Sequence, residues 1–354
     1  MTTPLRTLDI GFMPLVDSAP LIAAARLGLD RANGLRLRLH RQASWAAIRD
    51  RLLSGELDAV HAMAAMVYGV QTGIGGPRAD LAILMGLNCN GQAITLSPTL
   101  ADACSGDRPL ADVLRALPRR PVFAQTFPTG THAVWLYYWL AAQGVDPNHG
   151  IDVVTLPPPQ MPDAMARGEL DGFCAGEPWG AQAEAMGAGR RVIRSGQLWP
   201  GHPEKVLACR RETAALQPEL ALALTKTVLE ACRWLDDPAH HPDVVAWLSE
   251  PDAIGVPAAC IAACLHPSED ERPGEGLRFH AGGDANFPWL SDGRGFLRQF
   301  RRWGWLPAAP AKDDDWLRDV HRLQTYREAA RALGVAVPVR DERESVLFDG
   351  VRWD

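Results

Sequence analysis

The chain has 354 residues and a formal net charge of −6. That length suggests about two domains, and a composition of 47% hydrophobic and 22% charged residues excludes a disordered or fibrous chain. The acidic balance argues against direct binding of nucleic acid through phosphates, and no apolar run is long enough to span a membrane.

The first part of the chain alternates short apolar runs with helical patterns. It predicts strands at 8–12, 35–40, 58–62, 81–85 and 92–96, and helices at 20–27, at 45–53 and up to Val70. The same alternation then resumes. After a helix that ends near Leu117, strands are expected at 122–125, 151–156 and 173–175, with helices at 131–143, at 160–167 and from Pro178. This rhythm predicts parallel sheets with helices on both faces.

One more strand is expected at 206–209, and the rest of the chain is mostly helical. The predicted helices are 217–235, 243–248, 258–264, 293–302 and 315–333. Two α/β units that join near residues 98 and 200 predict a clamshell. We expect a discontinuous first domain, residues 1–98 with 203–354, and a second domain of residues 99–202. Ligands of open α/β sheets bind beyond the carboxyl ends of the strands, which places the site in the cleft between the two units.

Common enzyme signatures are absent from the sequence. It contains no HExxH, GxSxG, Walker A or GxGxxG motif in the required context, so we expect no enzyme, no catalytic residue and no cofactor. The seven cysteines lack CxxC spacing, and we interpret them as reduced thiols of a cytoplasmic protein, with no metal site.

Two uncharged side chains stand at the starts of elements that could face the cleft. Trp45 begins a helix that Ser44 is expected to cap; it either lines the cleft or packs on a neighbouring helix. Gln92 begins a strand after an Asn-Gly turn and offers an amide that carries no charge.

Two further segments supply donors for an anion. In Pro128-Thr129-Gly130-Thr131-His132, Thr131 is the expected N-cap of a helix whose free N–H groups and dipole favour an anion, and His132 adds a side-chain donor. Lys205 precedes an apolar strand and could reach the cleft as the one cation. This set suits a planar monoanion, and bicarbonate or a carboxylate fits it as well.

At these residues the sequence resembles the nitrate/bicarbonate substrate-binding family of ABC transporters. The resemblance covers most of the chain, in the segments Gly11-Phe12-Met13-Pro14-Leu15, Gln42-Ala43-Ser44-Trp45, Gly91-Gln92-Ala93-Ile94-Thr95, Phe127-Pro128-Thr129-Gly130-Thr131-His132, Pro157-Pro158-Pro159-Gln160-Met161, Gly176-Glu177-Pro178-Trp179 and His202-Pro203-Glu204-Lys205. It implies the two-domain α/β fold of the type II periplasmic binding proteins.

The family also implies the ligand set. In its nitrate-binding members a Trp, a Gln, a His and a Lys hold the nitrate, which carries over to Trp45, Gln92, His132 and Lys205. The helix start at Gly130 and Thr131 and the backbone at Glu177 and Pro178 are expected near the same cleft. Bicarbonate-binding members use acidic chemistry and calcium instead, so keeping Gln92 and Lys205 resembles the nitrate branch, and nitrite could share the site.

The chain enters its first strand almost at once, without the leader of exported members. It therefore resembles the NasS-type cytoplasmic nitrate/nitrite sensors. Those are implied to sequester an RNA-binding ANTAR antiterminator of the NasT type when empty, and to release it on anion binding, which controls nitrate assimilation genes. Three alternatives stay open: the nitrate-binding subunit of an ABC importer with its leader trimmed, an enzyme such as a thiamine-pyrimidine synthase, and a regulatory domain of a transporter ATPase.

Overall fold

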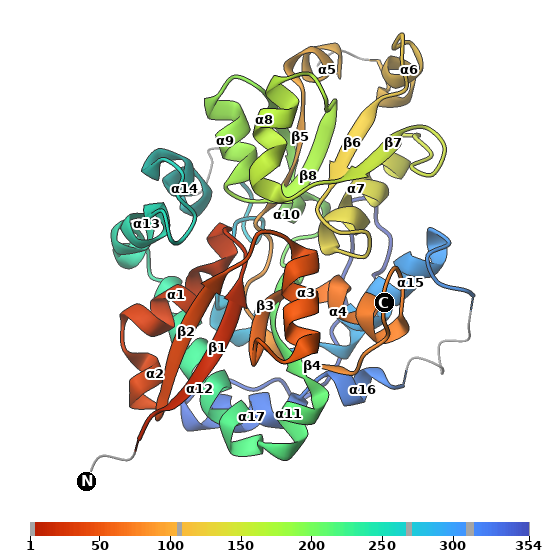
Figure 1. The fold of residues 1–354 in the computed structure, drawn as a ribbon. Coiled ribbons are helices and arrows are strands. Elements are labelled where there is room, and N and C mark those ends of the chain that lie inside the picture. Colours follow the sequence, from red (N-terminus) through yellow and green to blue (C-terminus); the bar gives the residue numbers. More distant parts are fainter. Residues whose placement is uncertain (1–3, 105–107, 267–270, 309–314, 354) are drawn as a thin grey trace.

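The computed structural model describes residues 4–104, 108–266, 271–308 and 315–353. Two α/β units stand one above the other, each built on a five-stranded sheet (Figure 1). The predicted fold class, two α/β domains, matches this arrangement, but each sheet is mixed and not parallel throughout as predicted. None of the helices within these described ranges is long and apolar enough to cross a membrane.

The first sheet has the strand order β2-β1-β3-β10-β4. Strands β1, β2 and β3 pair in parallel, whereas β10 runs antiparallel to both β3 and β4. The middle strand β3 and the edge strand β4 are both buried along their whole length, which explains their continuous apolar runs. The bounds are β1 (Arg6–Phe12), β2 (Leu35–Arg41), β3 (Ala59–Met63), β4 (Leu81–Gly86) and β10 (Lys205–Arg210).

The second sheet repeats this plan in the order β7-β6-β8-β5-β9. Strands β6, β7 and β8 pair in parallel, and β5 runs antiparallel to β8 and β9. In each sheet, therefore, one antiparallel strand lies between the parallel strands and an edge. The bounds are β5 (Gln92–Leu96), β6 (Val122–Gln125), β7 (Asp152–Thr155), β8 (Gly172–Gly176) and β9 (Arg190–Arg194).

Helices cover the sheets and fill the C-terminal half. In the first and second units they are α1 (Ala19–Arg26), α2 (Leu29–Ala32), α3 (Trp45–Ser54), α4 (Ala64–Thr72), α5 (Pro98–Cys104), α6 (Leu110–Arg115), α7 (Thr131–Ala142), α8 (Met161–Ala166), α9 (Trp179–Ala185) and α10 (Ser195–Leu198). After β10 come α11 (Arg211–Leu216), α12 (Pro218–Leu235), α13 (His241–Ser249), α14 (Ala258–Leu265), α15 (Leu290–Arg302), α16 (Leu317–Val320) and α17 (Leu323–Ala332). Short 3-10 turns are η1 (Val16–Ser18), η2 (Pro158–Gln160), η3 (Pro238–His240) and η4 (Ala281–Gly283).

Helix α7 packs against the C-terminal end of the chain. Its first ten residues are all buried, as expected of a helix that is apolar on every side. The ring of Trp135 on α7 lies 5.3 Å from that of Trp353, near the end of the chain, and Trp353 also packs on Trp199 at 4.8 Å. The C-terminal tail thus packs against the second unit.

Several predicted elements differ from the observed ones. Strand β9 was missed, because it is an arginine-rich, partly exposed edge strand without an apolar run. The single helix predicted at 315–333 is wrong. The chain leaves α16 at His321, which has extended backbone and bridges to Ile83 of β4, before α17 begins.

Sheet membership also bears on the domain boundaries. The boundary predicted at residue 98 assigns Gln92–Leu96 to the first domain, but these residues form β5 of the second sheet. The chain therefore crosses to the second unit before β5, earlier than predicted. In the other direction it returns to the first sheet with β10, close to the predicted boundary at residue 203.

Candidate anion-binding site

The two antiparallel strands bring their first residues to the edge where the parallel strands end. Lys205, the first residue of β10, lies opposite Met63, the last residue of β3. Gln92, the first residue of β5, lies opposite Gly176, the last residue of β8. Both side chains therefore start from the carboxyl edges of the sheets, where ligands of open α/β folds bind.

The start of α7 lies at the same place. The N-cap is Gly130, not Thr131 as predicted, and a Cβ at Gly130 would come within 2.6 Å of Met63 Cε, so a side chain there would require Met63 to move. Thr131 Oγ1 accepts a hydrogen bond from Gln92 Nε2 at 3.2 Å and donates one to Glu204 Oε1 at 2.9 Å. Thr131 thus links the two antiparallel strands instead of capping the helix.

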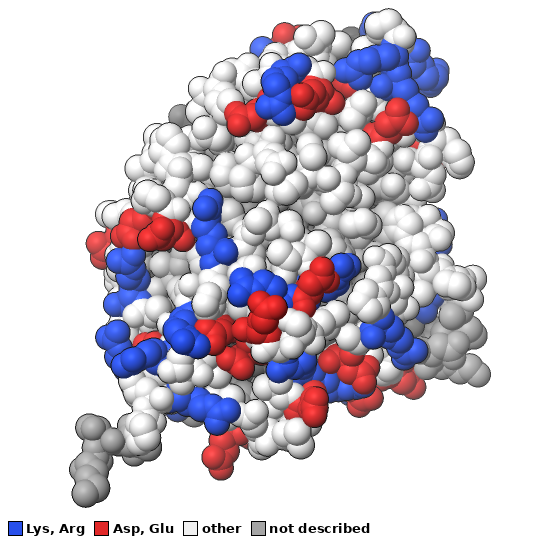
Figure 2. Space-filling model, viewed as in Figure 1, with Lys and Arg blue, Asp and Glu red and all other residues white. Residues whose placement is uncertain are grey.

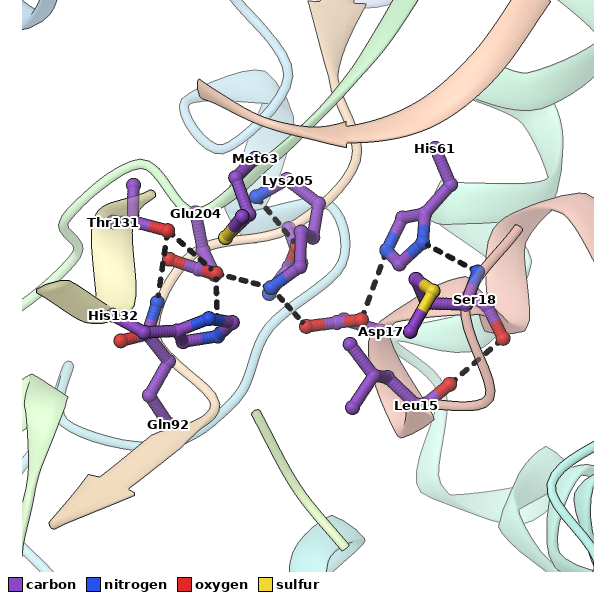
Figure 3. Close-up of polar contacts among 12 residues, drawn as sticks. Leu15, Asp17, Ser18, His61, Met63, Gln92, Thr131, His132, Glu204 and Lys205 are labelled. Atoms are coloured by element: carbon purple, nitrogen blue, oxygen red, sulfur yellow. Dashed lines mark hydrogen bonds and ion pairs between the residues drawn. The ribbon is translucent and has the colours of Figure 1, made fainter. Parts of the chain in front are cut away.

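Lys205 is the centre of the cluster. Its ammonium Nζ lies 2.8 Å from Asp17 Oδ2 and also pairs with Glu204 Oε1, and the three side chains are at most 1% exposed. Figure 3 shows the two carboxylates on either side of the ammonium, with His61 beyond Asp17 and His132 beside Glu204. Burial opposes the charge of Lys205, but the two carboxylates outweigh it and raise its pKa.

The two carboxylates differ in their surroundings. Asp17 Oδ1 lies 2.9 Å from His61 Nε2, and Lys205 with this histidine outweighs the effect of burial, so the pKa of Asp17 is lowered. Burial raises the pKa of Glu204 to about 7, although Lys205 and the hydrogen bond from Thr131 both act to lower it. Glu204 Oε2 is buried and has no hydrogen-bond partner in the described part of the chain.

Both histidines of the cluster are held neutral. Burial lowers the pKa of His61 despite its carboxylate partner, and burial with the nearby Lys205 keeps the pKa of His132 well below its ordinary value. His132 Nδ1 lies 2.5 Å from Thr126 Oγ1, and its Nε2 lies 3.4 Å from Glu204 Oε1. Nε2 has no hydrogen-bond partner among the described residues, and so it is available to a ligand.

Trp45 contacts this cluster and does not pack merely on a neighbouring helix. It is fully buried, and its ring centroid lies 5.5 Å from Lys205 Nζ and 6.3 Å from the ring of His132. Ser44 caps α3 as predicted, since its hydroxyl accepts a hydrogen bond from the Ala47 N–H at 3.1 Å. This cap fixes Trp45 as the first helical residue. No described residue accepts the indole N–H of Trp45.

Glu177 and Pro178 lie next to the cluster, but the Glu177 carboxylate is engaged elsewhere. Its Oε1 accepts from the Arg191 guanidinium at 2.8 Å, and its Oε2 accepts from the Ala181 N–H at 3.1 Å. The Glu177 carbonyl accepts from the Val16 N–H at 2.8 Å, which joins the second unit to η1 of the first. The backbone, not the side chain, therefore faces the site.

The structure brings Trp45, Gln92, Thr131, His132 and Lys205 into one buried group, with Gly130 beside it. Three members were not predicted from the sequence: Asp17, His61 and Glu204. Glu204 stands directly before Lys205 in a segment that was singled out, and Asp17 follows the end of β1, so their positions alone could have suggested them. That these residues bind the ligand stays a prediction.

The acidic residues raise the question of a metal. Within the described ranges, no group of three or more His, Cys, Asp and Glu side chains is arranged to hold a metal ion. Each carboxylate of the cluster is already paired with Lys205, which supplies the local positive charge.

Comparison with known proteins gives consistent matches along the chain. The model of the NMT1-like family matches residues 2–249. The nitrate/nitrite binding protein NrtA of Synechococcus elongatus is 35% identical, in a match that spans 98% of this chain and 83% of that protein. The nitrate import ATP-binding protein NrtC of Synechocystis is 33% identical, with 97% of this chain matching 53% of its length.

Among solved structures, the crystal structure of the periplasmic nitrate-binding protein NrtA from Synechocystis PCC 6803 matches with a TM-score of 0.92. It is 31% identical, and the match covers 98% of this chain and 95% of that chain. The predicted periplasmic-binding-protein fold is thereby confirmed. The prediction that the chain is not an enzyme agrees with these relatives. The chain belongs to the NMT1-like family and is similar, over nearly its whole length, to the NrtA binding proteins.

Proposed function

We propose that the chain binds nitrate or nitrite at the buried cluster around Lys205. The observation that carries this proposal is the convergence of Trp45, Gln92, His132 and Lys205, which come from four separate segments, on one position between the two sheets. The similarity to NrtA, whose name records nitrate and nitrite, points to the same ligands.

The available groups fit a small planar anion. The Lys205 ammonium has three N–H bonds, of which Asp17 and Glu204 take two. The Trp45 indole N–H is buried without an acceptor in the described residues and can donate. His132 Nε2 donates in the tautomer whose Nδ1 accepts from the Thr126 hydroxyl. Nitrate and nitrite only accept hydrogen bonds, so a site with several convergent donors suits them.

Calorimetric titration of the purified protein with nitrate, nitrite and bicarbonate tests the proposal. We expect binding of nitrate or nitrite and no response to bicarbonate. Binding of bicarbonate alone, or of none of the three anions, would contradict it.

For the role of the bound anion, we propose a cytoplasmic sensor of the NasS type that releases a NasT-type antiterminator when nitrate or nitrite binds. The state of the cysteines supports a reducing compartment. All seven are free, and Cys89, Cys174, Cys209, Cys232 and Cys260 are buried. Free thiols in such number are typical of cytosolic proteins and uncommon in exported ones.

The charge distribution fits a partner protein better than direct contact with nucleic acid. On the face in Figure 2, basic groups lie next to acidic ones, and a broad middle area carries no charge. Arg119, for example, pairs with Asp171 at 2.7 Å, and Arg120 pairs with Asp152 at 3.1 Å. Together with the acidic net charge, this mixed distribution leads us to place RNA binding on the partner.

The second candidate role is the anion-binding subunit of an ABC importer. The relatives favour it, because NrtC is named as a nitrate import ATP-binding protein and the NrtA of known structure as a periplasmic protein. In this role the partners are the membrane and ATP-binding subunits of a transporter.

One experiment separates the two roles. The protein is tagged at its chromosomal locus, its compartment is determined by fractionation, and its partners are captured with and without nitrate. A soluble cytoplasmic pool whose RNA-binding partner is lost on adding nitrate supports the sensor. A pool outside the inner membrane that captures transporter subunits refutes the sensor and leaves the importer.

A further inference from the structure

The charge balance at the proposed site is unfavourable for an anion unless a proton is added. Lys205 is the one cation in the cluster, and it already faces the carboxylates of Asp17 and Glu204. His61 and His132 are neutral because burial lowers both pKa values. With both carboxylates ionised the cluster carries one net negative charge, and a bound monoanion would make it two in a region closed to water. Such uncompensated charge is costly in a protein interior.

Glu204 is the group in the cluster that can remove this charge. Asp17 lies between Lys205 and His61, each within 2.9 Å, and these contacts stabilise its ionised form. The groups that face Glu204 are Lys205 from β10, Thr131 and His132 from α7, and Asp17 from η1; only Lys205 favours its charge strongly, while Asp17 opposes it. A proton is therefore held more readily on Glu204 than on Asp17.

The contacts of Glu204 leave one of its carboxyl oxygens free to carry a proton as a hydrogen-bond donor. Its Oε1 accepts from Thr131 and Lys205, whereas Oε2 is buried without a partner among the described residues. An ionised Oε2 can only accept, and it would repel an anion. A protonated Oε2 becomes a buried donor without a partner among the described residues, in addition to the Trp45 indole. Protonation thus turns a repelling group into a ligand.

We infer that Glu204 is a specificity-determining residue of the site, which takes up one proton together with the anion and donates it as a hydrogen bond from Oε2. This inference rests on the proposed binding of nitrate or nitrite. It selects for anions that only accept hydrogen bonds, and it makes the proton a second ligand whose binding is linked to that of the anion.

The primary test counts protons by calorimetry. Sodium nitrate is titrated into the full chain in buffers of different ionisation enthalpy, at about pH 8 and at about pH 5.5, on either side of the Glu204 pKa of about 7. We expect uptake of up to one proton per nitrate near pH 8 and almost none near pH 5.5. Nitrate affinity should fall by up to tenfold per pH unit above pH 7.

Variants assign the proton to a residue. In Glu204→Gln the side chain keeps its size and carries a permanent donor, so we expect no proton uptake and a nitrate affinity that does not change with pH. Glu212→Gln, on the exposed start of α11, is the matched control and should retain uptake and pH dependence.

Infrared difference spectroscopy of the wild-type protein gives a readout that does not depend on a variant folding. Nitrate binding near pH 8 should produce the band of a newly protonated carboxyl group. Nitrate binding without proton uptake near pH 8, or uptake that persists in Glu204→Gln, overturns the inference and leaves nitrate binding intact. Failure of nitrate to bind overturns both.

Discussion

Lys205 and Asp17 form a fully buried ion pair, with 2.8 Å between Nζ and Oδ2. Asp17 lies in the turn after β1, whereas Lys205 starts β10, a strand that the chain adds only after it has built the second unit. The ion pair therefore joins the turn after β1 to the start of β10, which are the first and last strands of this sheet in chain order. Removing one partner of such a pair leaves the other charge uncompensated.

Lys205→Met should weaken nitrate binding by at least about 30-fold, because the anion loses the one buried ammonium. The free energy of unfolding should also fall by about 3–5 kcal/mol, since two buried carboxylates lose their cation. Calorimetry and urea denaturation measure the two effects. Lys226→Met on α12 is the control, and it should behave like wild type in both. Unchanged nitrate affinity in Lys205→Met would remove Lys205 from the site.

Trp45→Phe keeps an aromatic ring at the start of α3 but removes the indole N–H. No described residue accepts that N–H, so the variant loses no hydrogen bond in the protein. Because Trp45 is fully buried, the smaller ring leaves a cavity, and the free energy of unfolding should fall by about 1–3 kcal/mol. A lost hydrogen bond to the anion should lower nitrate affinity by about five- to tenfold. Trp247→Phe, on α13 and away from the cluster, should leave affinity unchanged. Equal affinity for the two variants would show that the indole nitrogen does not contact the ligand.

The stability of the ligand-free protein should depend on pH through Glu204. Its pKa is about 7 in the folded protein, against an ordinary 4.5. Between these values the folded state holds a proton that the unfolded state has lost, so the free energy of unfolding falls as pH rises and reaches its full loss above pH 7. In Glu204→Gln the side chain does not titrate, so the free energy of unfolding does not fall in this way as pH rises. Its stability relative to wild type should therefore increase from about pH 5 to about pH 8, by a total on the order of 3 kcal/mol.

Urea denaturation without nitrate, at several pH values, measures this difference, and Glu212→Gln should follow wild type throughout. Parallel curves for wild type and Glu204→Gln would mean that Glu204 ionises normally in the folded protein.

The sequence was sufficient to predict what depends on local pattern. The spacing of apolar residues and the length of each apolar run predicted most strands and helices. The residues that begin β5, β10 and α7 were singled out because the starts of such elements gather at the edges of sheets where ligands bind. Two errors have one cause. The edge strand β9 and the break at His321 are set by pairing with distant segments, namely β5 and β4, and no local signal encodes those partners.

The acidic half of the site was missed because its role is not local, although its positions stand next to segments that were singled out. A search for anion donors selects Lys205 and His132, and it passes over carboxylates because they repel anions. Only the structure shows that Asp17 and Glu204 share the Lys205 ammonium, so the site is better described as a compensated charge cluster than as a cationic pocket. Whether a buried residue adds or cancels charge depends on partners far away in the chain.

The two units make a close contact at Gly69. Gly69 on α4 packs against Thr129, in the turn before α7, so closely that an added Cβ would lie 2.1 Å from Oγ1 and 2.6 Å from the Thr129 Cβ. Gly69→Ala should therefore push the start of α7, with Thr131 and His132, away from Lys205. We expect nitrate affinity to fall by tenfold or more, while glycine-to-alanine within a helix costs the fold little by itself. Gly76→Ala is the control, since it faces only the end of the Arg49 side chain at 2.9 Å. Calorimetry measures affinity, and small-angle scattering measures whether the variant is more open. If Gly69→Ala binds nitrate as wild type does, the start of α7 does not need its present position for the anion to bind.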